Sequence, residues 1–312
     1  MEFRTRVNIK AEKEKFHQGQ KLLSLGSCFA ENVGNRLTSA GFDILINPLG
    51  ILFNPKVIAD NIKEALSDDF DESLIVRRDG IYFHYLCHSD VNGIDENALR
   101  QEVNALRKAI RQRLKEADHL ILTFGTAWVY RHKSTDKIVA NCHKVPQINF
   151  SKSCLSNDEL IVIYESLIKQ IVEINPSLQI LLTVSPVRHV KNGLVDNNRS
   201  KAELILLSHK LTEKFDNVSY FPAYEIVMDE LRDYRFFDKD MIHPNEVAID
   251  YVYEQFVSTY FDDSAKEIGR LTEKIQKLEN HKPRFEDPDQ EAAQRVKINT
   301  FKEQVSNLKS RK

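Results

Sequence analysis

The sequence has few of the residues that build disulfide-bonded or metal-bound scaffolds. Only four of its 312 residues are cysteines, and no two of them form a C-x-x-C pair. Neither a disulfide framework nor a zinc motif of that spacing is therefore supported. We expect reduced thiols in a cytoplasmic protein, with no structural metal and no cofactor.

Long apolar runs and an excess of one charge are also missing. The longest nearly uncharged stretch, residues 120–130, is far shorter than the ~20 residues that cross a bilayer. The first ten residues alternate charged and apolar side chains, unlike a secretory signal. Lys and Arg number 44 and Asp and Glu number 46, a formal net charge of −2. We therefore expect neither nucleic acid nor membrane as a partner.

The sequence does contain enough apolar material for a large core. Hydrophobic residues make up 42% of the chain and charged residues 29%, near the globular average. Between residues 21 and 47, two apolar runs flank a turn and a helical segment, an order typical of a parallel α/β sheet. The same alternation predicts strands at 119–124, 178–184 and 218–221, a hairpin at 74–86, and helices at 55–66, 96–115, 158–174, 200–215 and 247–260.

The composition changes in the last part of the chain. We expect a main domain over residues 1–261 and a charged helical extension over residues 262–312. Residues 281–284 are expected to break this extension into two helices. One interpretation is a solvated arm that packs on its own domain; the other is an arm that joins chains into a homo-oligomer. The apolar residues of the first helix recur at helical spacing: Ile268, Leu271, Ile275 and Leu278.

Gly26-Ser27-Cys28 lies between a predicted strand and a predicted helix, at the sheet edge where ligands and nucleophiles gather. Gly26 allows a sharp turn, and a thiol at a helix N-terminus feels the positive end of the helix dipole, which lowers its pKa. The turn therefore predicts a nucleophile. The alternative is a small buried cysteine that fills the end of the strand.

Asp240 and His243 supply the partners that such a nucleophile needs. A histidine can take the proton, while a carboxylate bonded to its other ring nitrogen fixes the tautomer. A spacing of three residues in a turn before a helix allows this contact. The alternative is a surface motif that caps the following helix.

Several segments together resemble one known family. Leu25-Gly-Ser-Cys-Phe-Ala30 spells the motif that names the GSCFA family, which is grouped with the SGNH/GDSL hydrolases. Linked motifs in the family's order are more specific than any one of them, and the resemblance implies a three-layer, SGNH-hydrolase-like (flavodoxin-like) α/β fold. The other matching segments are Asn47-Pro-Leu-Gly-Ile-Leu-Phe-Asn-Pro55, His88-Ser89, Gly125-Thr-Ala-Trp128, Asn141-Cys-His-Lys144, Ser185-Pro-Val-Arg-His189 and Asp240-Met-Ile-His-Pro-Asn245.

The resemblance assigns roles to the residues at matching positions. Cys28 falls where the superfamily has its serine nucleophile, and Ser27 beside it is the alternative nucleophile. Asp240 and His243 match the Asp-x-x-His pair. Gly50 matches the glycine whose N–H lines the oxyanion hole.

The sequence departs from the superfamily at one position. The asparagine that completes the oxyanion hole is replaced by Ala127. The hydroxyl of Thr126 or the indole of Trp128 could take its place, or backbone donors alone could form the hole. Losing one such donor typically costs ~10²–10³ in rate.

Four further polar residues are candidates for substrate binding. Arg188 and His189 follow a predicted strand, and Arg188 is suited to clamp a carboxylate or phosphate; an ion pair with a loop carboxylate is the alternative. His88 and His143 match family positions and are expected to line the pocket with Trp128, although a place in the core is the alternative for Trp128. Each histidine follows a cysteine, but adjacent strand residues face opposite sides and cannot chelate a metal together.

These residues predict acyl transfer through a covalent acyl-enzyme. The resemblance implies an acyl-ester hydrolase or O-acyltransferase that acts on a small-molecule or glycan ester. The alternative is a catalytically lapsed fold that serves as a binding or scaffold module.

Overall fold

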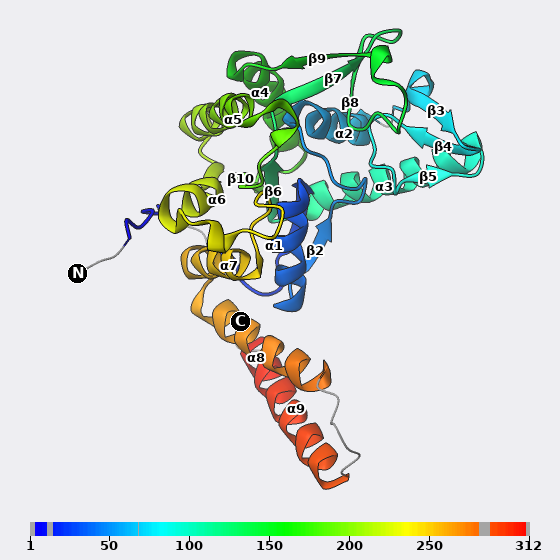
Figure 1. The fold of residues 1–312 in the computed structure, drawn as a ribbon. Coiled ribbons are helices and arrows are strands. Elements are labelled where there is room, and N and C mark those ends of the chain that lie inside the picture. The colour runs from blue at the N-terminus through cyan, green and yellow to red at the C-terminus, as the bar shows by residue number, and fades with distance from the viewer. Residues whose placement is uncertain (1–3, 11–14, 68, 281–287, 310–312) are drawn as a thin grey trace.

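Five short apolar segments form the central sheet. The computed structural model describes residues 4–10, 15–67, 69–280 and 288–309 (Figure 1). All strand pairs in this sheet are parallel, and the order across it is β2-β1-β6-β10-β11. The strands are β1 (Lys21–Gly26), β2 (Asp43–Ile46), β6 (His119–Phe124), β10 (Gln179–Val184) and β11 (Val218–Phe221).

Helices cover both faces of this sheet because successive strand residues are mostly apolar, so that each central strand is buried on both sides. Leu23, Leu120 and Ile180 belong to one buried cluster with helices α2 to α5, whereas Leu22 and Ile121 pack with α1 and α7 on the other face. The result is a three-layer α/β fold. The helices are α1 (Cys28–Ser39), α2 (Pro55–Ser67), α3 (Glu96–Glu116), α4 (Asn157–Ile174), α5 (Leu194–Lys214) and α7 (Glu246–Tyr260).

The strand order fixes where a ligand would bind. The chain passes from β1 to β2 on one side and returns through α2 and α3 to β6 on the other side of β1. The order therefore reverses between β1 and β6. In open α/β sheets, ligands bind beyond the carboxyl ends of the strands at such a point, and here the Cys28 turn follows β1.

Two small antiparallel sheets lie beyond the carboxyl ends of the central strands (Figure 1). The predicted hairpin is confirmed, with Asp79 and Gly80 both at positive φ between β3 and β4. The other sheet, which follows Gly125, was not predicted. The two sheets comprise β3 (Ile75–Arg78), β4 (Ile81–His84) and β5 (Asn92–Gly93), and β7 (Trp128–His132), β8 (Lys137–Val139) and β9 (Phe150–Cys154).

Short helical turns complete the main body. One of them is a π-helix (Ile226–Leu231), and Arg232, which ends it, has a left-handed backbone. The others are the 3₁₀ turns Glu72–Leu74, Gln147–Asn149, Val190–Asn192 and Tyr234–Phe236, and the single turn α6 (Ala223–Glu225).

The C-terminal extension is helical, as predicted. Helices α8 (Asp263–Asn280) and α9 (Pro288–Lys309) lie side by side and project from the main body (Figure 1). The near end of α8 is anchored, because Ile268 and Leu271 are buried and Gln276 donates to the Ser39 carbonyl at the end of α1. The predicted helix break at residues 281–284 lies outside the described residues, and the domain boundary at residue 261 stays a prediction. Among the described helices, none combines the length and apolarity that a membrane span requires.

Candidate active site

The turn between β1 and α1 is built around a glycine. Gly26 has φ +145°, and a Cβ there would lie 2.2 Å from the Thr123 carbonyl oxygen of β6. Only glycine allows the backbones of β1 and β6 to approach so closely before the chain turns. The N–H of Ser27 then donates to that same carbonyl at 3.1 Å. The turn is thus held firmly against the neighbouring strand.

Ser27 and Cys28 occupy different positions at the start of α1. Ser27 is the N-cap: its side chain is buried, and its Oγ accepts from the Phe29 N–H at 3.3 Å. Cys28 is the first helical residue and is a half-buried free thiol. The hydroxyl therefore has a structural partner, whereas the thiol lies at the positive end of the helix.

Burial outweighs the helix dipole at Cys28. Burial raises the pKa of the thiol above its ordinary value. The N–H groups of Phe29 and Cys28 and the charge of Lys201 lower this pKa, but by less. The lowered pKa expected from the helix terminus alone is therefore wrong. A half-buried sulfur loses more hydration than two N–H groups and a nearby cation replace.

The loop after β2 lies across the carboxyl ends of β1 and β6. Its Asn47 accepts from the Gly26 N–H at 2.8 Å through Oδ1, and the Leu52 N–H donates to the Gly26 carbonyl at 2.9 Å. Further along, the Phe53 carbonyl accepts from the N–H groups of Gly125 and Thr126 at 2.8 and 3.0 Å. This loop joins the segments that follow β1, β2 and β6.

Gly50, the predicted oxyanion donor, lies in the same loop. Its φ is +77°, and a Cβ there would meet the His88 side chain at 2.2 Å. Its N–H donates to the Asn47 carbonyl at 2.8 Å. The Gly50 N–H is therefore engaged in a turn and would have to leave it to reach a substrate.

Asp240 and His243 form the predicted pair. Asp240 Oδ2 lies 2.6 Å from His243 Nδ1, and Asp240 Oδ1 accepts from the N–H groups of Ile242 and His243. These backbone and ring donors lower the pKa of the Asp240 carboxyl to about 2. The carboxylate therefore holds the imidazole with a proton on Nδ1, so Nε2 is left as the acceptor. The capping role expected as the alternative belongs instead to Asn245, which caps α7.

His189 connects this pair electrostatically with the edge of the sheet. Burial, together with the neighbouring charges of Lys201 and His243, lowers its pKa to about 3. Lys201 in turn interacts with Cys28. The four groups thus form a chain of electrostatic neighbours, although no hydrogen bond joins Cys28 to His243 in the described part of the protein.

Comparison with known families decides the relationship of the chain. The profile of the GSCFA family matches residues 21–256, about three quarters of the sequence. The chain belongs to the GSCFA family. No curated protein matches it.

In this GSCFA protein, the two groups considered as substitutes for the absent asparagine have other partners. Thr126 Oγ1 lies 3.0 Å from Ser200 Oγ and accepts from the Trp128 N–H at 3.1 Å. The indole N–H of Trp128 donates to the Asp196 carbonyl at 3.2 Å. Both side chains tie the start of β7 to α5.

The polar residues predicted for substrate binding separate into two groups. Arg188 and His189 follow β10, where Arg188 Nη2 contacts Met228 Sδ at 3.1 Å and the Nε2 of His189 has no partner among the described residues. His88 lies against Gly50 and pairs with Asp90 at 3.0 Å. His189 therefore interacts electrostatically with His243, whereas His88 lies against the loop after β2.

His143 belongs to a hydrogen-bonded network near His88. Its Nε2 donates to the His84 carbonyl at 3.1 Å, so its Nδ1 accepts from Ser89 Oγ at 3.2 Å. Burial lowers the pKa of His143 to about 4, so the ring is neutral near pH 7. Among the described residues, no three His, Cys, Asp or Glu side chains are grouped so as to hold a metal ion.

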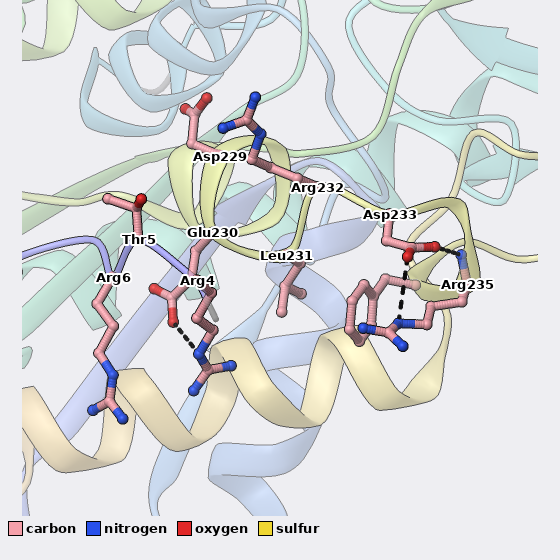
Figure 2. Close-up of a pocket in the computed structure, with 10 residues that line it drawn as sticks. Arg4, Thr5, Arg6, Asp229, Glu230, Leu231, Arg232, Asp233 and Arg235 are labelled. Atoms are coloured by element: carbon pink, nitrogen blue, oxygen red, sulfur yellow. Dashed lines mark hydrogen bonds and ion pairs between the residues drawn. The ribbon is translucent and has the colours of Figure 1, made fainter. Parts of the chain in front are cut away.

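A groove of about 680 Å³ lies elsewhere, beside the π-helix, and contains none of the predicted site residues (Figure 2). Its charges are mixed: Figure 2 shows Arg4 paired with the buried Glu230, and Arg235 paired with Asp233. Because these neighbours largely neutralise each other, the groove has no strong preference for an anion.

Two residues at the edge of the sheet were missed in the sequence. Asn47 has a buried Nδ2 without a partner among the described residues, next to Gly26. Lys201 is 1% exposed and donates to two carbonyls at the ends of β6 and β10. The available signal for Lys201 was its spacing from Leu204 and Leu211, which places it on the buried stripe of α5.

Proposed function

We propose that this protein is an acyl-ester hydrolase or O-acyltransferase of the SGNH type whose nucleophile is Cys28. The observation that carries the proposal is the 2.6 Å contact between Asp240 Oδ2 and His243 Nδ1. It leaves Nε2 as the proton acceptor, which is the arrangement that nucleophilic catalysis requires. The position of Cys28 at the point where the strand order reverses supports the same role.

The reaction proceeds in two steps. Cys28 Sγ forms a bond to the acyl carbon and its proton passes to His243 Nε2; the bond from that carbon to the ester oxygen then breaks, and the alcohol leaves with the proton. In the second step, His243 takes a proton from water or from another hydroxyl, which attacks the thioester and restores the thiol. The choice of acceptor separates hydrolysis from transfer.

The developing oxyanion needs donors near Cys28. The backbone N–H of Cys28 at the start of α1 is one. The Gly50 N–H becomes another when it leaves the Asn47 carbonyl. Asn47 is a third candidate, because its Oδ1 is fixed by Gly26 and its buried Nδ2 has no partner in the described residues. An unpaired buried donor costs roughly 1–3 kcal/mol, which a substrate oxygen would relieve.

Hydrolysis of 4-nitrophenyl acetate tests the proposal. We expect Cys28→Ala to lower kcat/KM by at least about 10³-fold, and His243→Ala by about 10²–10⁴-fold. Asn47→Asp keeps the acceptor for Gly26 but loses the donor, so we expect a reduced kcat. Cys154→Ala is the matched control, because Cys154 is another half-buried free thiol and lies on β9. Equal activity in the Cys28, His243 and Cys154 variants would refute the site.

Mass spectrometry separates the finer alternatives. A trapped acetyl group on the peptide that carries Cys28, rather than on Ser27, would identify the nucleophile. Adding glycerol to the assay would divert product to acetylglycerol if the enzyme is a transferase. The free state of all four cysteines supports a reducing compartment, and we propose the cytoplasm.

One observation favours a second function. Burial raises the pKa of Cys28, whereas a resting thiolate is typical of a thiol enzyme. A binding or scaffold module of this fold would keep such a thiol. It would show no acetylated intermediate and no turnover with any ester tested.

A further inference from the structure

Two aromatic side chains lie on one face of β7. Trp128 and Tyr130 are two residues apart on this strand, so they point to the same side of the sheet and lie about 7 Å apart along it. Each is half-buried and keeps part of its ring in solvent. Together they form a short platform of rings at the start of β7.

Two lysine side chains lie over these rings. The Lys152 ammonium lies 5.3 Å from the centre of the Trp128 ring and 5.0 Å from that of Tyr130, and the Lys191 ammonium lies 5.7 Å from the centre of the Tyr130 ring. Lys152 is the register partner of Tyr130 on β9, whereas Lys191 lies in the 3₁₀ turn after β10. We call Trp128, Tyr130, Lys152 and Lys191 the aromatic–lysine surface.

Neither lysine pairs with a carboxylate within the described ranges. Lys152 donates to Asn192 Oδ1, a neutral acceptor, and both lysines are exposed. The carboxylate of Asp196, whose carbonyl accepts from the Trp128 indole, is paired with Arg199 at 3.2 Å. Two ammonium groups beside one ring repel each other, and an exposed cation gains only about 0.5–1 kcal/mol from a ring face. The surface is therefore suited to a negatively charged ligand.

The surface is continuous with the carboxyl edge of the central sheet. In the loop after β10, the His189 ring lies 5.2 Å from the Phe53 ring and against Gly125, where a Cβ would meet His189 Nε2 at 3.1 Å. Two residues later, Lys191 lies over Tyr130. A ligand that lies along β7 can therefore extend to the end of β6, the strand beside β1.

We propose that the aromatic–lysine surface binds an anionic oligosaccharide, a linear chain of sugar rings that carries carboxylates. The apolar C–H faces of successive sugar rings stack on Trp128 and Tyr130, while Lys152 and Lys191 pair with the carboxylates. The binding stands without the proposed function. Its use, to hold the sugar chain of an ester substrate beside the Cys28 turn, rests on that function.

Two other polymers fit this surface less well. A nucleic acid strand is bound through many phosphate contacts, whereas the surface contains two lysines and the whole chain has a formal net charge of −2. An acidic peptide that added a strand would have to pair with β9, an edge strand, where Lys152 is the kind of residue that blocks such pairing. A sugar chain needs neither many cations nor a free strand edge.

The test uses the fluorescence of Trp128, which is the single tryptophan of the chain and reports binding at this surface directly. We expect a saturable change with trigalacturonic acid, a linear sugar with a carboxylate on every ring. Maltotriose, which has a similar length but no charge, should bind about tenfold more weakly, the combined effect of two exposed ion pairs. Added salt should weaken the binding of trigalacturonic acid because it screens such pairs.

Variants without the two charges test the contacts. Lys152→Gln combined with Lys191→Gln keeps two donors but loses both charges, so we expect the affinity for trigalacturonic acid to fall about tenfold, to that for maltotriose. Lys137→Gln is the matched control, because Lys137 lies on β8, the opposite edge of the same sheet, and pairs with Asp71 at 3.3 Å. We expect this variant to bind trigalacturonic acid as wild type does.

Three results would overturn the proposal. They are no saturable response to trigalacturonic acid at millimolar concentration, an equal loss of affinity in Lys137→Gln, and tighter binding of a short oligothymidylate, which would assign the surface to single-stranded nucleic acid. Because fluorescence needs no turnover, this proposal and the proposed function fail separately. Sugar binding without ester hydrolysis would refute the proposed function alone, and hydrolysis without sugar binding would refute the surface alone.

Discussion

Ser27 and Cys28 are adjacent nucleophile-capable residues, and the structure gives them separate tasks. The Ser27 hydroxyl is buried and caps α1, while the Cys28 thiol is half-buried at the first helical position. The choice between them, which the sequence leaves open, can therefore be tested by separating stability from reactivity.

We expect Ser27→Ala to lower the free energy of unfolding by about 1 kcal/mol, the usual cost of a lost N-cap. Cys28 alkylation in this variant should remain within about twofold of the wild-type rate, because the thiol does not depend on the cap oxygen. Urea unfolding and alkylation kinetics measure the two quantities. Loss of hydrolysis in Ser27→Ala with the stability intact would assign the nucleophile to Ser27 instead.

At this scale the sequence singled out the candidate residues better than it did their surroundings. Cys28, Asp240 and His243 could be predicted because their types and spacing are those that acyl transfer would require. Lys201 could not, since a lysine in an amphipathic helix normally faces solvent. Asn47 was hidden for a different reason: its unpaired amide is visible only once the Gly26 N–H is seen to occupy Oδ1.

Among the elements, β6 illustrates how a polar residue can be buried at the start of a strand. His119 is 3% exposed, and its ring lies 3.9 Å from that of Phe16. Burial lowers the pKa of His119 to about 4. The unfolded chain therefore takes up a proton below about pH 6.5 that the folded protein refuses.

This imbalance predicts sensitivity to acid. The contribution of His119 to stability is complete above pH 6.5 and falls as the pH drops toward 4, amounting to about 2 kcal/mol between pH 7 and pH 5. We expect His119→Leu to lose less stability over this interval than wild type by that amount, measured by urea unfolding. His209→Gln, at an exposed histidine of α5, serves as the control. The same decline in all three proteins would contradict the prediction.

The elements that sequence reasoning missed depend on partners distant along the chain. Strand β9 is the polar segment Phe150–Cys154, and only its pairing with β7 makes it a strand. Helix α5 was expected to begin at Ser200 but begins at Leu194. Its first turns contain poor helix formers, and Asn197 is instead stabilised by its bond to the His189 N–H. The long apolar strands and amphipathic helices, in contrast, could be predicted from the local sequence pattern alone.

In the whole molecule, the extension shares the core of the main body at one end only. Ala265 of α8 is buried with α1 and α7, and Gly269 approaches Ala40. No α9 side chain is buried to the same degree among the described residues. The two helices of the extension thus differ in what they contribute to the fold.

We expect removal of residues 281–312 to leave the free energy of unfolding nearly unchanged, whereas removal of residues 262–312 should lower it by several kcal/mol. The reason is that burial of each large apolar side chain contributes roughly 1.5–3 kcal/mol. Urea unfolding tests this comparison. Light scattering on the same proteins tests whether the extension joins chains into a homo-oligomer. If it does, removal of α9 should reduce the number of chains per particle.

The Phe53 carbonyl accepts two N–H groups from the segment after β6. These bonds fix the loop after β2 in place across the carboxyl ends of the strands. The two outer sheets attach on either side of it, through α2 and through Gly125. Insertions and deletions in those sheets can therefore accumulate without disturbing the loop after β2. Relatives should therefore differ mainly in the outer sheets, and the loop between Asn47 and Phe53 should keep its length.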